Sequence, residues 1–195
     1  MGYLRKFSRL RSFAKDQEGS IAVEAVLVFP ILFWAYLATF VYFDAFRVQS
    51  TTIKAAYTIS DQVSRETGYI TPKYLDAIYR LHEFLTTSNE DTKLRISVVT
   101  YDATSKSYKV RWSQQRGNAG VLTNSNISSI VSQLPTMPAN EVVVVVQSWL
   151  EYEPMFTVGL DAYTIENLVV TRPRFNSAQL CYNSSNTGGS STATC

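Results

Sequence analysis

The stretch at residues 20–43 constrains this chain most, because it is apolar or small throughout and carries a single charge, Glu24. As a helix, these 24 residues would extend about 36 Å, at ~1.5 Å per residue. A hydrocarbon core of ~30 Å can be crossed by such a helix with some tilt. The sequence therefore predicts a transmembrane helix over residues 20–43, with the carboxylate of Glu24 about one turn from its start.

The remainder of the chain is polar enough to predict one modest soluble domain beside this helix. Mean hydropathy over the 195 residues is −0.05, whereas a chain built mostly of membrane helices would be far more apolar. The net charge is only +2, but the segment before the apolar stretch is basic. It contains Arg5, Lys6, Arg9, Arg11 and Lys15 against Asp16 and Glu18.

Basic residues beside a membrane span usually mark its cytoplasmic end. A nucleic-acid-binding arm is another interpretation of such a cluster, but the position directly before an apolar stretch favours orientation. We therefore expect residues 1–19 to form a cytoplasmic leader and everything after residue 43 to lie outside the cytoplasm.

The apolar stretch does not resemble a secretory signal peptide, whose apolar core is shorter and is followed by a cleavage site with small residues. No Ala-x-Ala site follows Phe43, so we expect the helix to be retained. A carboxylate inside a span is costly, although less so near its end, where the helix dipole favours it. A capping box does not explain Glu24, which stands four residues after Ser20 instead of three.

Gly19, directly before the stretch, and Glu24 within it occur together in one known arrangement. A basic leader, Gly19, Ser-Ile-Ala-Val-Glu and an unbroken apolar helix resemble the processing site of type IV prepilins. This resemblance implies that a membrane aspartic peptidase cuts between Gly19 and Ser20, so that the mature chain keeps its helix. It also implies that Glu24 becomes the fifth mature residue and pairs with the new α-amino group of a neighbouring subunit, away from water.

The sequence Gly-Ser-Ile-Ala-Val-Glu-Ala-Val-Leu-Val-Phe-Pro more specifically resembles the TadE-like minor pilins, or pseudopilins, of bacterial tight-adherence (Tad) pili. The matching positions are Gly19, Ala22, Val23, Glu24, Ala25 and Pro30. A looser resemblance covers residues 142–174, a valine-rich strand followed by Tyr-Glu-Pro and a strand ending in Arg-Pro-Arg. The resemblance implies a pilin-like fold and a role in assembling a pilus.

Helical spacing continues beyond the apolar stretch to about Glu66, and Gly68 is a natural stop. One face of this extension carries Val48, Thr52, Ala55, Ala56, Ile59 and Val63. Thr71 and Pro72 predict the start of a second helix. We expect its buried stripe to consist of Tyr74, Ile78, Leu81 and Leu85, with the single histidine, His82, as a packing or surface residue beside it.

From residue 93 the apolar period changes to two, which predicts strands. Residues 94–98 and 108–112 should form an antiparallel hairpin with one apolar face around a polar turn at 102–107. After a surface loop at 114–126, a short helix is expected at 127–133. The five valines at 142–146 predict a central strand covered on both faces, with the long helix over one of them.

Pro154 should end this strand, and residues 164–171 supply another. The predicted fold class is therefore α+β, with a single N-terminal transmembrane helix that extends into a long spine and packs on a small antiparallel sheet. Its expected divisions are a leader at 1–19, the span at 20–43, the helical extension at 44–67, an α+β periplasmic domain at 68–175 and a flexible tail at 176–195.

Both cysteines lie in the tail, where Cys181 and Cys195 would close a 15-residue ring. In an oxidising compartment they predict a disulfide worth roughly 3 kcal/mol in the loop-entropy model. Two free thiols are the alternative, and no cysteine or histidine spacing suggests a metal site.

The sequence contains no Ser-His-Asp set, phosphate-binding glycine loop, metal-ligand spacing or paired carboxylates in a fixed frame. The acidic residues Glu151, Glu153, Asp161 and Glu166 have no partner that would give them a defined chemical role. We therefore predict no enzyme, no catalytic residue, no cofactor and no metal.

The resemblance implies a single-pass protein of the bacterial inner membrane whose domain lies in the periplasm, or in an extracellular pilus after assembly. The implied partners are other pilin or pseudopilin subunits, the prepilin peptidase and the pilus assembly machinery, with no nucleic acid. Two alternatives stay open: an uncleaved single-pass scaffold of an envelope secretion or assembly machine, and a membrane-tethered module that binds a small ligand.

Overall fold

The computed structural model describes residues 20–86, 92–175, 180–186 and 192–195. They divide into two compact units. The first contains residues up to Phe43 together with the loop Met155–Leu160, and the second contains Asp44–Pro154 and Asp161–Cys195. Helix α2 (Ser20–Ser64), of 45 residues and about 68 Å, supplies residues to both. It ends two residues before the predicted end at Glu66.

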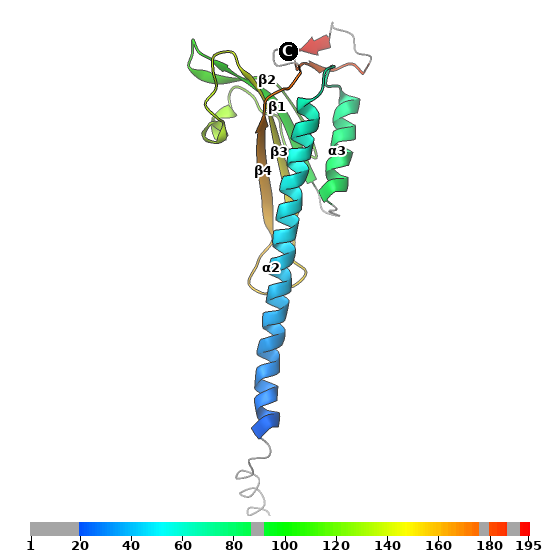
Figure 1. The fold of residues 1–195 in the computed structure, drawn as a ribbon, viewed down its shortest axis with the longest axis vertical. Coiled ribbons are helices and arrows are strands. Elements are labelled where there is room, and N and C mark those ends of the chain that lie inside the picture. The colour runs from blue at the N-terminus through cyan, green and yellow to red at the C-terminus, as the bar shows by residue number, and fades with distance from the viewer. Residues whose placement is uncertain (1–19, 87–91, 176–179, 187–191) are drawn as a thin grey trace, which may run out of the picture. The chain divides into compact units, whose positions relative to one another are not determined.

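The second unit is built on a four-stranded antiparallel sheet in the order β2-β1-β3-β4 (Figure 1). Its strands are β1 (Thr92–Asp102), β2 (Ser107–Arg116), β3 (Val142–Tyr152) and β4 (Tyr163–Thr171). Helix α3 (Pro72–Thr86) lies beside the last turns of α2 over one face of the sheet. A long apolar N-terminal helix and a small antiparallel sheet confirm the α+β layout.

The main core lies between the two helices and this face of the sheet. Ile59 and Val63 of α2 and Ile78 of α3 pack on a layer of strand residues. Of the helix face predicted for the extension of α2, five residues are buried and Val48 is half-buried. The strand layer consists of Leu94, Ile96, Val98, Trp112, Val142, Val144 and Val146.

A second, smaller core covers part of the opposite face. Val99, Val143 and Val145 point to this side and meet the connection between β2 and β3. That connection contributes Leu122, Ile127, Ile130, Leu134 and Met137. The valines at 142–146 are therefore covered on both faces, as the absence of alternation predicts, and each is at most 4% exposed.

The predicted single apolar face of the β1–β2 hairpin is wrong. The register shifts between Val98 and Val99, so that Val98 pairs with Trp112 but Val99 pairs with Val110. This β-bulge leaves one extra residue on β2 and moves the side chains beyond it to the other face. Trp112 accordingly joins the main core, whereas Val110 and Tyr108 pack on the second one.

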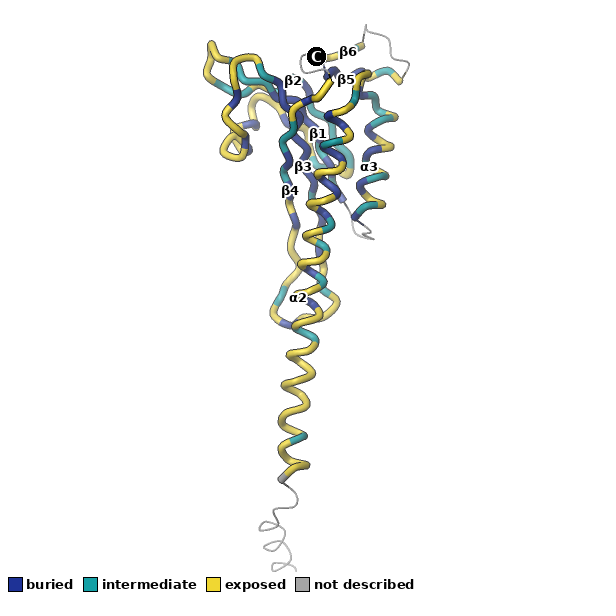
Figure 2. Tube along the Cα trace, in the orientation of Figure 1, coloured by how far each residue is buried: buried dark blue, intermediate teal, exposed yellow. Residues whose placement is uncertain are grey.

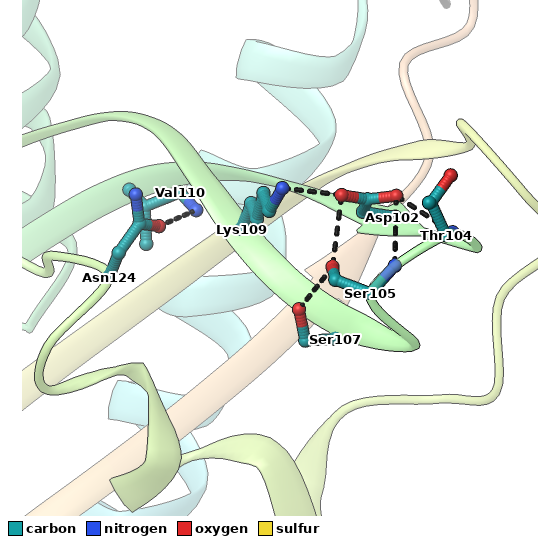
Figure 3. A network of polar contacts seen from close by, with 7 residues as sticks. All are labelled: Asp102, Thr104, Ser105, Ser107, Lys109, Val110 and Asn124. Atoms are coloured by element: carbon teal, nitrogen blue, oxygen red, sulfur yellow. Dashed lines mark hydrogen bonds and ion pairs between the residues drawn. The ribbon is translucent and has the colours of Figure 1, made fainter.

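The hairpin turn is held by polar contacts around Asp102 (Figure 3). Its carboxylate accepts hydrogen bonds from the Thr104 amide and the Ser105 hydroxyl, both at 2.9 Å, and pairs with the Lys109 ammonium. Lys109, Ser105 and Thr104 together hold the pKa of Asp102 well below its usual range. Farther along β2, the Asn124 side chain accepts a hydrogen bond of 2.7 Å from the Val110 amide and ties the following loop to the strand.

Helix α3 begins as predicted, because the Thr71 hydroxyl accepts a hydrogen bond of 3.3 Å from the Tyr74 amide. Its predicted buried stripe is partly wrong. Ile78 is buried, but the other fully buried residues are Leu75, His82 and Thr86. The remaining predicted residues, Tyr74, Leu81 and Leu85, are half-buried. The buried side of the helix is therefore centred on Leu75, Ile78 and His82 and not on the predicted stripe. The helix predicted at 127–133 is instead two short 3₁₀ turns, η2 (Ile127–Ser129) and η3 (Val131–Gln133).

The C-terminal segment returns to the main core. Leu180 is 2% exposed, and its carbonyl accepts a hydrogen bond of 2.7 Å from the Trp112 indole. The following residues bridge to Ile70, just before α3, through two backbone hydrogen bonds with Cys181 and Asn183. A disulfide joins Cys181 to Cys195, beside the two-stranded pair β5 (Tyr182–Asn183) and β6 (Ala193–Thr194).

Candidate membrane and assembly surface

The first unit is dominated by an apolar helix surface, at 21–40, that its described residues leave largely uncovered. Between residues 21 and 40, every described residue of α2 is exposed or half-buried (Figure 2). Large side chains are among the most exposed, including Ile21 at 79%, Val26 at 70% and Phe29 at 68%. This part of α2 is long and apolar enough to cross a membrane.

The apolar residues lie on all sides of this part of α2 and not along one stripe. Val26, Leu27 and Phe29 are each more than 60% exposed, yet successive positions point about 100° apart around a helix. A helix that is apolar all round requires an apolar environment on every side. Lipid or the apolar surface of other protein chains would supply such an environment.

The backbone and side chains of this part of the helix suit such surroundings. The Thr39 hydroxyl donates to the Ala35 carbonyl at 2.8 Å, one turn earlier, and so is satisfied within the helix. The helix continues through Pro30, which lacks the amide hydrogen that would otherwise bond to the preceding turn. This tolerance of an internal proline is common in membrane helices.

Glu24 is the one charged residue of the described helix before Asp44. Its side chain is exposed and borders a shallow hollow of about 270 Å³ on the helix surface. The other lining residues are Ile21, Ala25, Val28, Phe29 and Leu32. Among the described residues, Glu24 has no ion-pair partner. The arrangement is a carboxylate at the edge of an apolar patch, suited to a group that brings both a positive charge and apolar atoms.

The predicted cleavage site falls at the margin of the described chain. Gly19 lies outside the described residues, and so does the basic leader at 1–19. Ser20 is described only as the first helical residue of α2. Cleavage between Gly19 and Ser20 therefore stays a prediction from the sequence.

The loop Met155–Leu160 belongs to the same unit as the apolar helix, although some 110 residues separate them in sequence. In this unit, the only described residues that are fully buried are Val41 on the helix and Val158 on the loop, at 1% and 7% exposed. The patterns considered in the sequence do not identify this loop. The sequence does carry a signal for it, because seven uncharged residues, 154–160, stand between Glu153 and Asp161.

The strand ends next to this loop carry acidic and phenolic groups. Glu151, Tyr152, Glu153 and Tyr163 line a pocket of about 220 Å³ together with Ala162 and Thr164. The Tyr152 hydroxyl donates to the Asp44 carboxylate at 3.1 Å. Burial and this hydrogen bond raise the pKa of Tyr152 to about 12.

The other acidic residues considered from the sequence have structural surroundings. Glu151 forms an ion pair of 2.9 Å with Lys93 on β1. Glu166 lies opposite Trp149 in the sheet register and close enough to Arg95 to favour the charged guanidinium. Among the described residues, no three histidine, cysteine or acidic side chains are grouped as metal ligands.

His82 is a packing residue, one of the two roles expected for it. It is 0% exposed, and neither ring nitrogen has a hydrogen-bond partner among the described residues. Burial lowers the pKa of His82 to about 4. The imidazole is therefore neutral at physiological pH. It fills space in the core, and its two ring nitrogens are buried without a hydrogen bond among the described residues.

Comparison with protein-family models, curated proteins and solved structures gives no significant match to this chain. The function proposed below therefore depends on the sequence and the fold alone.

Proposed function

We propose that this protein is a minor pilin or pseudopilin that takes part in assembling a Tad-type pilus. The observation that carries the proposal is the division of α2 into an apolar half exposed on all sides and a half buried against an antiparallel sheet. The resemblance of residues 19–30 to TadE-like proteins supports the same function. A plain anchor needs the apolar half but gives no reason for Gly19 and Glu24 to stand at this spacing.

In the proposed role, the apolar half of α2 first crosses the inner membrane, with residues 1–19 in the cytoplasm and the α+β domain in the periplasm. A prepilin peptidase cuts after Gly19, and the helix then moves from lipid into a bundle of neighbouring helices. Lipid and a helix bundle are both apolar, so the same exposed side chains can be buried in either environment.

Glu24 would then pair with the α-amino group that cleavage creates on a neighbouring subunit. A buried carboxylate is tolerated when an opposite charge and hydrogen bonds satisfy it. The hollow beside Glu24, lined by Ile21, Ala25 and Val28, leaves room for the start of another helix.

The maturation step is tested by mass spectrometry of the N-terminus in cells with and without their prepilin peptidase. We expect a chain that begins at Ser20 only when the peptidase is present. Gly19→Val should leave the chain uncut, whereas Ser20→Ala serves as a matched control and should still be cut. An intact leader in a strain that assembles pili would contradict the proposal and favour an uncleaved membrane scaffold.

The assembly step is tested with Glu24→Ala and Glu24→Gln. Both should be cleaved and remain in the membrane, but both should reduce piliation by roughly tenfold or more, since losing one partner of a buried ion pair costs about 3–5 kcal/mol. Thr39→Val, on the same helix, is the control and should pilate normally. Unchanged piliation in both Glu24 variants would exclude the pairing role.

A further inference from the structure

We propose that the loop Met155–Leu160 is a membrane-contacting loop, whose apolar side chains enter the outer interfacial layer of the bilayer that α2 crosses. The proposal rests on the membrane-spanning role given to α2 above. It is independent of cleavage after Gly19 and of any role in a pilus.

The loop meets the helix where the exposed part of α2 ends. The loop and the apolar part of α2 form one compact unit, and Figure 1 shows the β3–β4 connection beside α2. Described helix residues from 21 to 40 are exposed or half-buried, and Val41 is the first that is buried. Val158 is buried on the loop side. The loop therefore covers the helix at the level of Val41.

The level of Val41 corresponds to the outer boundary of a bilayer core that α2 crosses. The uncharged run between Glu24 and Asp44 contains 19 residues and is about 28 Å long, close to a hydrocarbon thickness of ~30 Å. Val41 lies three residues before Asp44, which is about 4.5 Å along the helix axis. When the uncharged run fills the bilayer core, the loop lies at its outer boundary.

The side chains of the loop suit the interfacial layer of a membrane. Its six residues, Met-Phe-Thr-Val-Gly-Leu, carry no charge, and acidic residues flank it as Glu153 and Asp161. Met155 is 78% exposed and Phe156 is 44% exposed, although both are apolar. Tyr42 and Phe43, on the helix of the same unit, are exposed as well. Aromatic residues of this kind are typical of the membrane–water interface.

The backbone of the loop sets a limit on how deeply it can enter. Lipid-exposed irregular backbone does not occur inside the hydrocarbon region, because its polar groups would lack partners. The loop backbone must therefore stay in the hydrated interfacial layer, with the Met155 and Phe156 side chains directed inward. The flanking carboxylates of Glu153 and Asp161 favour neutral over anionic lipid headgroups, so the contact is apolar and not electrostatic.

Lipid is the occupant that these observations favour over a second copy of the chain. The exposed apolar residues of the loop belong to the same compact unit as the exposed apolar part of α2, which needs an apolar medium around it. A contact between copies would depend on protein concentration in the membrane, whereas a lipid contact would not.

The test uses the full chain, with its disulfide intact, reconstituted in phosphatidylcholine vesicles at large lipid excess. Single cysteines are introduced by Met155→Cys, by Phe33→Cys in the apolar helix and by Thr104→Cys in the β1–β2 turn. Each is labelled with an environment-sensitive fluorophore, and nitroxide-bearing lipids serve as quenchers. Phe156→Cys provides a second loop position if the Met155 variant does not fold.

We expect the labels at positions 155 and 33 to emit at shorter wavelength and to lose most of their intensity to the lipid quencher. The label at Thr104→Cys should stay unquenched. The signal at position 155 should be unchanged when the lipid excess is raised fivefold and when a third of the lipid is replaced by phosphatidylglycerol.

Two results would overturn the proposal: no quenching at either loop position while position 33 is quenched, or quenching at position 155 that disappears on dilution in lipid. The second result would identify a contact between copies. No quenching at position 33 would instead contradict the membrane-spanning role of α2. The label at position 33 therefore separates failure of that premise from failure of the loop proposal.

Discussion

The two halves of helix α2 share one backbone conformation, but they meet their surroundings in opposite ways. From residue 21 to 40 no described residue is buried, whereas Ala55, Ala56, Ile59 and Val63 are at most 2% exposed. The first half distributes large apolar side chains around the whole helix. The second half confines burial to one face and places charges such as Arg47 and Lys54 in water. Apolar content alone does not decide where a helix resides; its distribution around the axis does.

Residue size differs between the halves as well. The buried face of the second half contains Ala55, Ala56 and Ser60, which allow the helix to approach the sheet closely. The Ser60 hydroxyl bonds directly to the Thr171 hydroxyl on β4. The first half carries Phe29, Phe33 and Trp34, which extend outward and suit a loose apolar medium or a helix bundle.

The largest expected difference between the halves is in the loss of domain stability when one apolar residue in each is truncated. Ile59→Ala should destabilise the domain by about 2–5 kcal/mol, because it leaves a cavity in the main core. Leu27→Ala, in the exposed half, should change domain stability by no more than about 0.5 kcal/mol. Urea unfolding of the full chain in detergent micelles, followed by tryptophan fluorescence, measures both. Equal losses in the two variants would contradict the division of α2.

A smaller effect is expected from opening the C-terminal ring. Cys181→Ser with Cys195→Ser should reduce domain stability by roughly 3 kcal/mol in the loop-entropy model. The exposed half of α2 should be unaffected, so membrane association should not change. The same urea titration, with and without reductant on the unchanged chain, provides the comparison. Loss of membrane association on reduction would show that the two halves are not independent.

The smallest expected effect is a loss of domain stability at acidic pH. His82 has a pKa of about 4 when folded and an ordinary value of 6.5 when unfolded, so only the unfolded state gains a proton between these values. Above pH 6.5 both states are neutral and the group contributes nothing to pH dependence. As pH falls from 6.5 toward 4, stability is lost, by about 2 kcal/mol at pH 5.

His82→Leu should remove this acid sensitivity, since leucine has similar volume and no titrating nitrogen. In this variant, the urea midpoint should fall less between pH 7 and pH 5 than it does in the unchanged chain. A steep loss of stability that persists in the leucine variant would assign the acid sensitivity to other groups.

The elements with strong periodic patterns could be predicted from the sequence. The face of α2 from Val48 to Val63 and the central valine strand both follow from spacing and run length, because burial on one face or on both leaves a direct trace in the order of residues. The cap at Thr71 follows from local hydrogen bonding between neighbours in sequence.

The features that could not be predicted from the sequence depend on contacts between distant parts of the chain. The bulge at Val98 and Val99 lets β1 and β2 contribute side chains to two cores on opposite faces of the sheet. No local sequence pattern encodes it. The rotation of α3 toward Leu75 and His82 is likewise chosen by the sheet beneath it. The partnership of the loop Met155–Leu160 with α2 links segments more than 110 residues apart.

The return of the C-terminal segment to the main core has a consequence for the order in which the domain can form. Leu180 fills the core beside Trp112, and Cys181 and Asn183 bond to Ile70, so the first and last parts of the domain close on each other. A chain is synthesised from its N-terminus, and the segment at 180–183 therefore arrives after every strand of the sheet. Until it arrives the core lacks one wall, and the domain stays open while most of its length emerges. The main core can therefore close only after all four strands of the sheet have been synthesised, so the segment at 180–183 controls when this domain becomes fully folded.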